Sequence, residues 1–404
     1  MTPQEARARD AADPLRVYRD AFVLPDGVIY LDGNSLGPLP RATPAALADI
    51  AERQWGERLI RSWNEGWIEA PRRVGGKIAR LIGAAEDEVI VADSTSVNLF
   101  KLLVGALRHA APRTTILSET GNFPTDLHIA EGAVGCVPGA RLKAVPRESL
   151  RQAVDADTAV LMLTHVHYKT SECFDMSQWS SIAREAGALS LWDLSHSVGA
   201  IPVDLNAAGA DLAVGCGYKY LNGGPGAPAF LYVSKRLQEQ LASPLSGWMG
   251  HAAPFGFADA YAPAPGMMRW LAGTPPMLGL AALEAGLDVW QDVDQQHVAQ
   301  KSAALFDVMA AIGRKLGLVC VSPADPAQRG SHISFRHPDA YALCQALIAH
   351  GVIGDFRDPD ILRFGLTPLY LGYEDVVRAG EILGDILAND THHDPAFRNR
   401  NAVT

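Results

Sequence analysis

Two short apolar runs, each ending on side chains that can do chemistry, constrain the fold of this chain more than any other feature. Residues 188–192 suit a buried strand in length and flanking polarity, and this run ends on Asp193. A second run, residues 211–217, leads to Tyr218 and Lys219. Because reactive groups in open α/β sheets lie beyond the carboxyl ends of parallel strands, we expect Asp193 and Lys219 in one crevice.

A carboxylate and a lysine at neighbouring strand ends match two demands of the cofactor pyridoxal phosphate. The lysine amine can form an imine with the aldehyde, and the carboxylate can keep the pyridine nitrogen protonated, so that the ring withdraws electrons from a substrate. The alternative is a turn-capping Asp193 and a surface Lys219. Lys219 lies between Tyr218 and Tyr220 with no other charged residue from position 214 to 221, which favours the cofactor site.

The same cofactor needs a phosphate site, which we expect upstream at the start of a helix. Residues 88–92 read as a strand, 93–96 as its polar exit and 97–104 as a helix with apolar positions at helical spacing. Thr95 and Ser96 therefore offer hydroxyls and free backbone N–H groups to a dianion. The alternative is an ordinary helix cap formed by Ser94 or Thr95.

Composition excludes several classes of protein. A net charge of −10 and a pI near 5.6 argue against nucleic-acid and anionic-membrane surfaces. The five cysteines have no metal-site spacing, and His165 and His167 lack a third ligand, so we predict no metal. No apolar signal segment or membrane-length apolar run is present, which predicts a cytoplasmic protein.

Strand and helix patterns alternate through most of the chain, which predicts an α/β fold with a mostly parallel sheet flanked by helices. The C-terminal part instead reads as a small α+β layer, and 404 residues exceed what one core usually holds. We therefore predict an N-terminal segment against the active site (1–45), a large domain (46–285), a small domain (286–390) and a mobile tail (391–404).

Seven motifs in order along nearly the whole chain carry a family resemblance: YLDGNSLGPLP, ADSTSVNLF, NFPTD, WDLSHSVGA, GYKYLNGGPG, GWMGH and RFGLTPLY. Together they resemble the kynureninases, which are fold-type-I pyridoxal-phosphate hydrolases. The resemblance implies hydrolytic cleavage of the Cβ–Cγ bond of kynurenine, or of 3-hydroxykynurenine, to anthranilate or its 3-hydroxy form and alanine, in tryptophan catabolism. It also implies a homodimer.

The resemblance assigns roles to further residues. Those expected at the cofactor are Phe123 over the ring, Asp126, Thr164 and His196 beside it, and Trp248 and Thr274 at the phosphate or pocket, where the neighbouring subunit could supply them. Those expected at the substrate are Ser35, Trp63 and Arg363. Trp63 and Asn64 stand in the region where animal members have a histidine that contacts the aryl ring, and because that histidine is absent we favour kynurenine over its 3-hydroxy form. Tyr218 could bind the phosphate or assist hydration of the substrate ketone.

Some alternatives remain open at this point. Arg363 could bind the substrate carboxylate, or it could form a structural pair with an acid such as Asp358 or Asp360. The chain could also be another fold-type-I enzyme, such as a cysteine desulfurase or an aminotransferase, although no cysteine lies in a suitable glycine-rich loop. A ligand-binding relative without activity would have no need of an imine-forming lysine.

Overall fold

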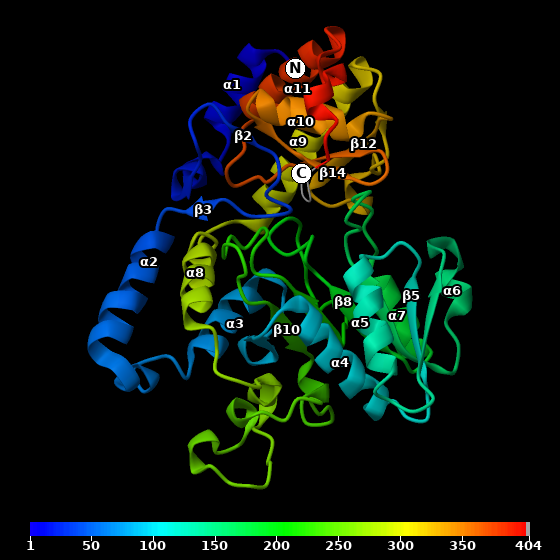
Figure 1. Ribbon diagram of the computed structural model, residues 1–404. Helices are drawn as coiled ribbons and strands as arrows, with labels where there is room; N and C mark the ends of the chain where they lie inside the picture. Colours follow the sequence, from blue (N-terminus) through cyan, green and yellow to red (C-terminus); the bar gives the residue numbers. More distant parts are fainter. Residues whose placement is uncertain (401–404) are drawn as a thin grey trace.

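A central sheet forms the core of the large domain (Figure 1). It has seven strands in the order β4-β10-β9-β8-β7-β5-β6. The computed structural model describes residues 1–400. Strand β10 is antiparallel to both of its neighbours, and the pairs from β9 to β6 are parallel. The strands are β4 (Val89–Val91), β5 (Thr115–Glu119), β6 (Arg141–Val145), β7 (Thr158–Thr164), β8 (Leu189–Asp193), β9 (Leu212–Gly215) and β10 (Phe230–Val233).

The central strands are buried on both faces, as their continuous apolar runs require. Along β7, Leu161 and Leu163 belong to one hydrophobic cluster and Val160 and Met162 to another, because successive side chains of a strand point to opposite faces. The helices that cover the two faces are α3 (Ala70–Leu81), α4 (Thr95–His109), α5 (Pro124–Val134), α7 (Met176–Glu185) and α8 (Met277–Asp288). This layered arrangement confirms the predicted α/β fold.

The small domain lies above the large one in Figure 1 and has an antiparallel sheet in the order β11-β12-β15-β14. Its strands are β11 (Val319–Cys320), β12 (His332–Arg336), β14 (Asp355–Arg357) and β15 (Ile361–Gly365), with the helices α9 (Gln295–Lys315), α10 (Ala340–Ala349) and α11 (Tyr373–Ala388). This antiparallel sheet with its helices has the α+β layout predicted from the sequence.

The N-terminal segment packs against the small domain. Helix α1 (Pro3–Ala12) is linked to α11 by Asp10, whose carboxylate accepts hydrogen bonds from the backbone N–H groups of Tyr373 and Glu374. Strand β2 (Ile29–Tyr30) pairs with β13 (Val352–Ile353), and β1 (Phe22–Val23) pairs with β3 (Leu39–Pro40). The loop after β2 is thereby held between the two domains.

The sequence pattern predicts helices over 11–22, 43–60 and 235–241, and the structure differs in all three segments. The helix predicted over 11–22 is a 3-10 turn at Arg16–Ala21, because Pro14 disfavours helix at the residue before it. The helix predicted over 43–60 is α2 (Thr43–Asp49) followed by a π-helix (Ile50–Arg58) and a 3-10 helix (Leu59–Trp63). The helix predicted over 235–241 is a 3-10 turn at Lys235–Leu237.

The last described residues form short turns rather than a long element. They are 3-10 turns at Thr391–His393 and Pro395–Phe397, and the Tyr341 hydroxyl of α10 donates to the Asn399 carbonyl. Positions 401–404 of the predicted tail lie outside the described residues. No described helix is both long enough and apolar enough to span a membrane.

Candidate active site

Asp193 and Lys219 leave the sheet at the same edge. Strands β8 and β9 are parallel, with Asp193 opposite Val214, and β9 ends at Gly215, just before Tyr218 and Lys219. Asp193 is buried, and its Oδ1 accepts a hydrogen bond of 2.8 Å from the Ser195 backbone N–H. The two side chains predicted from sequence therefore stand at neighbouring carboxyl ends of the sheet, where α/β enzymes bind their ligands.

Lys219 is surrounded by rings. Its Nζ lies 3.0 Å from His196 Nε2, 5.8 Å from the ring centre of Tyr218 and 6.0 Å from that of Phe123. Burial, followed by repulsion from the Lys219 charge, holds the pKa of His196 well below its usual range. His196 is therefore a neutral imidazole, and its Nε2 can accept a hydrogen bond from the lysine amine.

Asp126 and Thr164 lie beside Asp193. Thr164, at the end of β7, is opposite Asp193 in the register of the sheet, and its hydroxyl lies 3.0 Å from Asp126 Oδ2 and also contacts Asn122 Oδ1. Burial, followed by the negative charge of Asp193, raises the pKa of Asp126 well above the usual range of a carboxyl group. Asp126 therefore holds a proton, and the two acids together carry one negative charge.

The helix start proposed for phosphate lies at the same edge of the sheet. Strand β4 is antiparallel to β10, which is antiparallel to β9, so β4 runs in the direction of β8 and β9. Ser94 is the N-cap of α4, and its hydroxyl accepts from the Val97 N–H at 3.3 Å. The N–H groups and hydroxyls of Thr95 and Ser96 in the first turn remain available to an anion.

The loop after β2 packs directly on the lysine loop. The Gly37 N–H donates to the Tyr218 carbonyl at 2.8 Å, and a Cβ at Gly37 would stand 2.2 Å from the Lys219 carbonyl oxygen. Only glycine permits this approach. The contact holds the preceding residues of the loop, including Ser35, close to the lysine segment.

Arg363 has a different partner from those considered in the sequence. Its guanidinium is fully buried and forms a two-pronged ion pair with Asp355, and it also donates to the Ser35 hydroxyl at 2.9 Å and to the Tyr168 carbonyl. The acids suggested by sequence bind elsewhere: Asp358 pairs with Arg400, and Asp360 pairs with Arg336. Arg363 thus has a structural partner and still faces the loop that carries Ser35.

Arg363 and Lys219 are connected through two aromatic residues. Tyr168, whose carbonyl accepts from Arg363, packs edge-on against Phe123 with 5.3 Å between ring centres, and Phe123 faces the Lys219 amine. His332 of β12 also lies 5.5 Å from His196, ring centre to ring centre. The predicted carboxylate-binding arginine and the predicted cofactor-binding lysine therefore belong to one contiguous site between the domains.

Trp63 and Trp248 lie together, although they are far apart in the sequence. Their ring centres are 6.4 Å apart, and Trp248 also packs edge-on against Phe255 at 5.7 Å. Thr274 is exposed. In the described part of the chain, no direct interaction joins Trp63, Trp248 or Thr274 to Lys219 or Asp193, so one chain by itself does not bring these predicted residues into the centre of the site.

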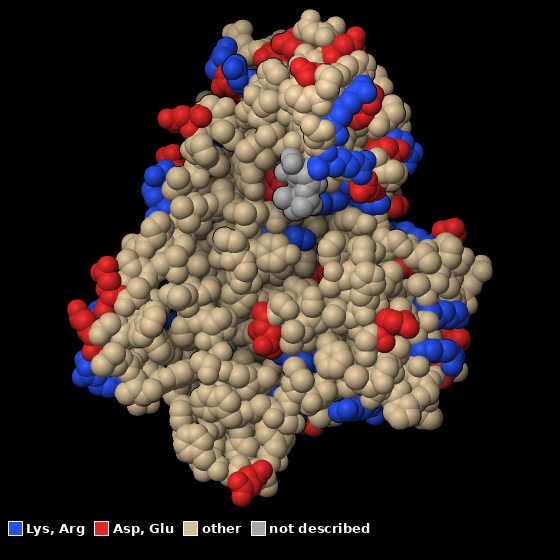
Figure 2. Space-filling model, viewed as in Figure 1, with Lys and Arg blue, Asp and Glu red and all other residues tan. Residues whose placement is uncertain are grey.

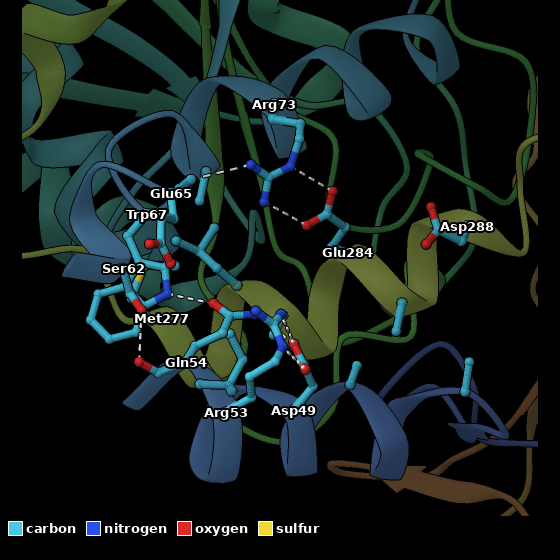
Figure 3. A pocket seen from close by; sticks show the side chains of 18 residues that line it. Asp49, Arg53, Gln54, Ser62, Glu65, Trp67, Arg73, Met277, Glu284 and Asp288 are labelled. Atoms are coloured by element: carbon cyan, nitrogen blue, oxygen red, sulfur yellow. Dashed lines mark hydrogen bonds and ion pairs between the residues drawn. The ribbon is translucent and has the colours of Figure 1, made fainter. Parts of the chain in front are cut away.

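A separate cavity of about 420 Å³ lies between the helical segment 43–63, here called the α2 arm, and helices α3 and α8 (Figure 3). Its polar lining is already paired: Arg73 makes two 2.9 Å hydrogen bonds to Glu284, and Trp67 donates to Gln54 at 2.6 Å. None of the residues predicted for the site lines this cavity. It is therefore distinct from the Lys219 site.

Sequence reasoning did not anticipate the acids and the second arginine around Arg363. Asp355 and Arg357, on β14, and Asp32, in the loop after β2, were not identified, although the charged pattern Asp-Phe-Arg-Asp-Pro-Asp in an otherwise apolar segment was a usable signal. The spacing of His165 and His167 suits a metal pair that lacks a third ligand. Within residues 1–400, the group with metal-ligand spacing is instead Asp339, His392 and His393.

Charged residues on the face in Figure 2 lie mainly around its edges and mix both signs, with a broad uncharged area over the large domain. This face carries no continuous basic surface of the kind that phosphate backbones bind.

Comparison with known proteins identifies the family. The chain is 51% identical over 417 residues to a kynureninase of Burkholderia mallei and 49% identical over 414 residues to a kynureninase of Pseudomonas fluorescens, with full coverage of both sequences in each case. The chain belongs to the kynureninase family. A model of the kynureninase C-terminal domain also matches residues 298–383, which lie in the small domain.

Solved structures support the fold of this kynureninase family member. A cysteine desulfurase from Thermococcus onnurineus has a TM-score of 0.76 at 18% identity and covers 93% of this chain and 98% of its own. The C-DES protein, solved with glycine covalently linked to its PLP cofactor, has a TM-score of 0.78 at 18% identity and covers 91% of this chain and 99% of its own. At these identities the likeness confirms the fold-type-I architecture.

Proposed function

We propose that this protein hydrolyses the Cβ–Cγ bond of L-kynurenine to anthranilate and L-alanine, with pyridoxal phosphate held at Lys219. The observation that carries the proposal is the placement of Lys219 and Asp193 at neighbouring strand ends, in a chain 51% identical to a kynureninase over its whole length. The relatives named above are kynureninases, and C-DES is a PLP protein.

The side chains present fit this cofactor. Lys219 offers an amine beside the neutral His196, buried Asp193 offers a carboxylate for the ring nitrogen, and Phe123 offers an aromatic face near the amine. The first turn of α4, with Thr95 and Ser96, offers N–H groups and hydroxyls for the phosphate. When bound, the cofactor withdraws electrons from the substrate Cα.

Lys219 would then move the proton at the substrate Cα. Neutral His196, 3.0 Å from the lysine Nζ, can accept a hydrogen bond from the amine and so help to hold it in place. The single negative charge shared by Asp126 and Asp193 would stabilise a proton on the pyridine nitrogen of the bound cofactor. Because Asp126 is protonated, the pair Asp126 and Asp193 carries a single negative charge, and the site does not bury two ionised carboxylates.

Tyr218 would act as a hydrogen-bond donor. Burial is the main cause that raises the pKa of the Tyr218 hydroxyl above its usual range, so the phenol stays protonated at neutral pH. A protonated phenol beside Lys219 can donate to the phosphate or to the substrate ketone as water adds to it. Both roles are consistent with its position.

The substrate would be held at its two ends. Arg363, beside Ser35, would bind the α-carboxylate, and Trp63 would lie near the aryl ring, with Trp248 next to it. An indole offers a flat apolar face and one N–H donor, whereas a histidine offers a nitrogen that can accept from a phenol. A tryptophan at this position therefore favours kynurenine over 3-hydroxykynurenine.

We also propose that the working protein is a homodimer in the cytoplasm. Several large apolar side chains of the α2 arm, the 244–265 loop and the start of α8 are exposed in a single chain: Trp55, Leu59, Ile60, Phe255, Phe257 and Leu278. Monomeric proteins rarely leave so much apolar surface in contact with water. A second copy would cover it, and could supply Trp248, together with the adjacent Trp63, and Thr274 to the neighbouring site.

One set of measurements tests the activity. Purified protein with pyridoxal phosphate is incubated with kynurenine and, separately, with 3-hydroxykynurenine, while the fluorescence of the aromatic amine and the formation of alanine are followed. We expect both products with kynurenine and neither with Lys219→Ala. An aminotransferase would give pyridoxamine phosphate in place of alanine, and that result would refute the proposal. Light scattering during size exclusion tests the dimer, which Ile60→Asp should weaken if the arm is part of the interface.

A further inference from the structure

Arg363 has little hydrogen-bonding capacity left for a substrate. A guanidinium carries five N–H groups. The Nε–H donates to Asp355 Oδ1 at 2.8 Å, the Nη2 group donates to Asp355 Oδ2 and to Ser35 Oγ, and Nη1 donates to the Tyr168 carbonyl. One Nη1 hydrogen remains. Arg363 can grip a carboxylate with two parallel hydrogen bonds only if it first releases Ser35 or Asp355.

Arg357 lies next to this arginine and has donors to spare. Its Nη2 donates to Asp355 Oδ2 at 2.7 Å and to Ser35 Oγ at 3.2 Å, so the two guanidinium groups share both a carboxylate oxygen and a hydroxyl. Among residues 1–400, the other bond that Arg357 donates is a long one of 3.4 Å from Nη1 to its neighbouring carbonyl of Phe356. The side chain is 34% exposed, whereas that of Arg363 is 1% exposed.

We propose that Arg357 is a second binding residue for the carboxylate of the amino-acid substrate, acting beside Arg363 where both guanidinium groups meet Ser35. This inference rests on the proposed function, because it takes the substrate to be an amino acid bound near Ser35. Asp355 would then hold the two arginines in position, and each arginine would contribute donors to the carboxylate.

The charges of the cluster suit one carboxylate. Arg357 and Arg363 contribute two positive charges, and Asp355 one negative charge. Burial, followed by repulsion from Asp355, raises the pKa of Asp32 to about 8, so Asp32 is largely neutral near pH 7. The cluster therefore has a net charge of +1, which a single substrate carboxylate would neutralise. With Arg363 alone beside Asp355, the local charge would be zero and the substrate carboxylate would gain little.

The test measures recognition of the carboxylate apart from turnover. Holoenzyme is titrated with L-alanine and with L-alaninamide, which lacks the carboxylate, while the cofactor absorbance is followed. We expect Arg357→Gln to weaken L-alanine binding by about tenfold or more and to change L-alaninamide binding by less than about threefold. Arg336→Gln is the matched control, because Arg336 is an exposed arginine of the same sheet and pairs with Asp360.

The inference would be overturned if Arg357→Gln weakened the binding of L-alanine and of L-alaninamide equally. It would also be overturned if Arg357→Gln weakened L-alanine binding no more than Arg336→Gln does. Arg357→Lys keeps the charge but not the planar fork, so it should fall between wild type and Arg357→Gln, and it decides the question if the Gln variant does not fold. If wild type discriminates between the ligands but does not cleave kynurenine, only the proposed function fails. If Arg357→Gln cleaves kynurenine with an unchanged KM, only this inference fails.

Discussion

The two buried carboxylates beside the cofactor site should respond very differently to the same substitution. Asp126 and Asp193 are 1% and 4% exposed, and each can be replaced by asparagine, which has nearly the same shape. Burial and the charge of Asp193 give Asp126 a pKa well above its usual range, so it is already neutral. Asp126→Asn therefore removes no charge, whereas Asp193→Asn removes the one charge that faces the pyridine nitrogen.

The magnitudes follow from this difference. An asparagine at position 126 can still accept from the Thr164 hydroxyl and donate to Asp193, so at most one neutral hydrogen bond weakens, which costs about 1 kcal/mol or less. The loss in kcat/KM should stay within about tenfold. At position 193, two unit charges about 4 Å apart interact by about 4 kcal/mol at an effective dielectric constant of about 20. Losing that interaction should lower kcat/KM by about a thousandfold.

The assay is steady-state hydrolysis of kynurenine by both variants, with the cofactor content of each preparation measured by absorbance and the fold checked by circular dichroism. The Ser195 N–H can still donate to the side-chain oxygen of asparagine at position 193, so a folded Asp193→Asn protein is expected. Equal losses for the two variants, with full cofactor content in both, would show that the proton does not reside on Asp126 and would refute the reasoning.

Three further predictions concern stability and cofactor retention. Asp32 binds its proton more tightly in the folded than in the unfolded protein. Wild type should therefore lose stability relative to Asp32→Asn as pH rises from about 4 to about 8, by up to about 1.4 kcal/mol per pH unit. Urea unfolding of both proteins at pH 6 and 8 measures this, and the same difference in unfolding free energy at both pH values would contradict it. Lys101 is fully buried and bonds to Asp93 and the Trp270 carbonyl at 2.7 Å each, whereas Asp93 is 31% exposed. Asp93→Asn, which strands the buried charge, should therefore cost about 3 kcal/mol, and Lys101→Met, which removes that charge, should cost less; the reverse order in unfolding experiments would be contrary evidence. Borohydride should fix the cofactor to wild type but not to Lys219→Ala, as measured by mass spectrometry, and labelling at another lysine would contradict the assignment.

The sequence predicted the sheet and the positions of its reactive residues because both depend on local patterns. Apolar runs at 159–163, 188–192 and 211–217 give β7, β8 and β9 to within one or two residues at each end. The polar exit of each strand then places Asp193, Lys219 and Thr164 at one edge by topology alone. Ser94, one of the two residues considered as a helix cap, is the observed N-cap of α4.

The partner of Arg363 depends on strand register, which the sequence pattern does not show. Asp355 is eight residues from Arg363, on the adjacent antiparallel strand β14, and only the register of β14 with β15 places the two side chains opposite each other. Asp358 and Asp360 are closer to Arg363 in sequence, but they follow the end of β14 and pair with other arginines. Closeness along the chain was therefore a poor guide to the partner.

The protonation states of the acids in the site also depend on contacts between different strands and loops. Asp126, Asp193 and Asp32 are the same residue type, and nothing local marks which of them holds a proton. Asp126 is neutral because it is buried next to the charge of Asp193, and the pKa of Asp32 is raised to about 8 because Asp32 is buried and, in addition, lies near the charge of Asp355 on β14. Arg363 and Arg357 keep Asp355 ionised, with a pKa lowered to about 2 even though burial alone would raise it. A site that is to receive a pyridinium and a carboxylate needs one net negative charge where the pyridinium binds and one net positive charge where the carboxylate binds. The proton on Asp126 leaves one negative charge beside Asp193, and the proton on Asp32 leaves one positive charge beside Arg357 and Arg363, with the number of acids unchanged.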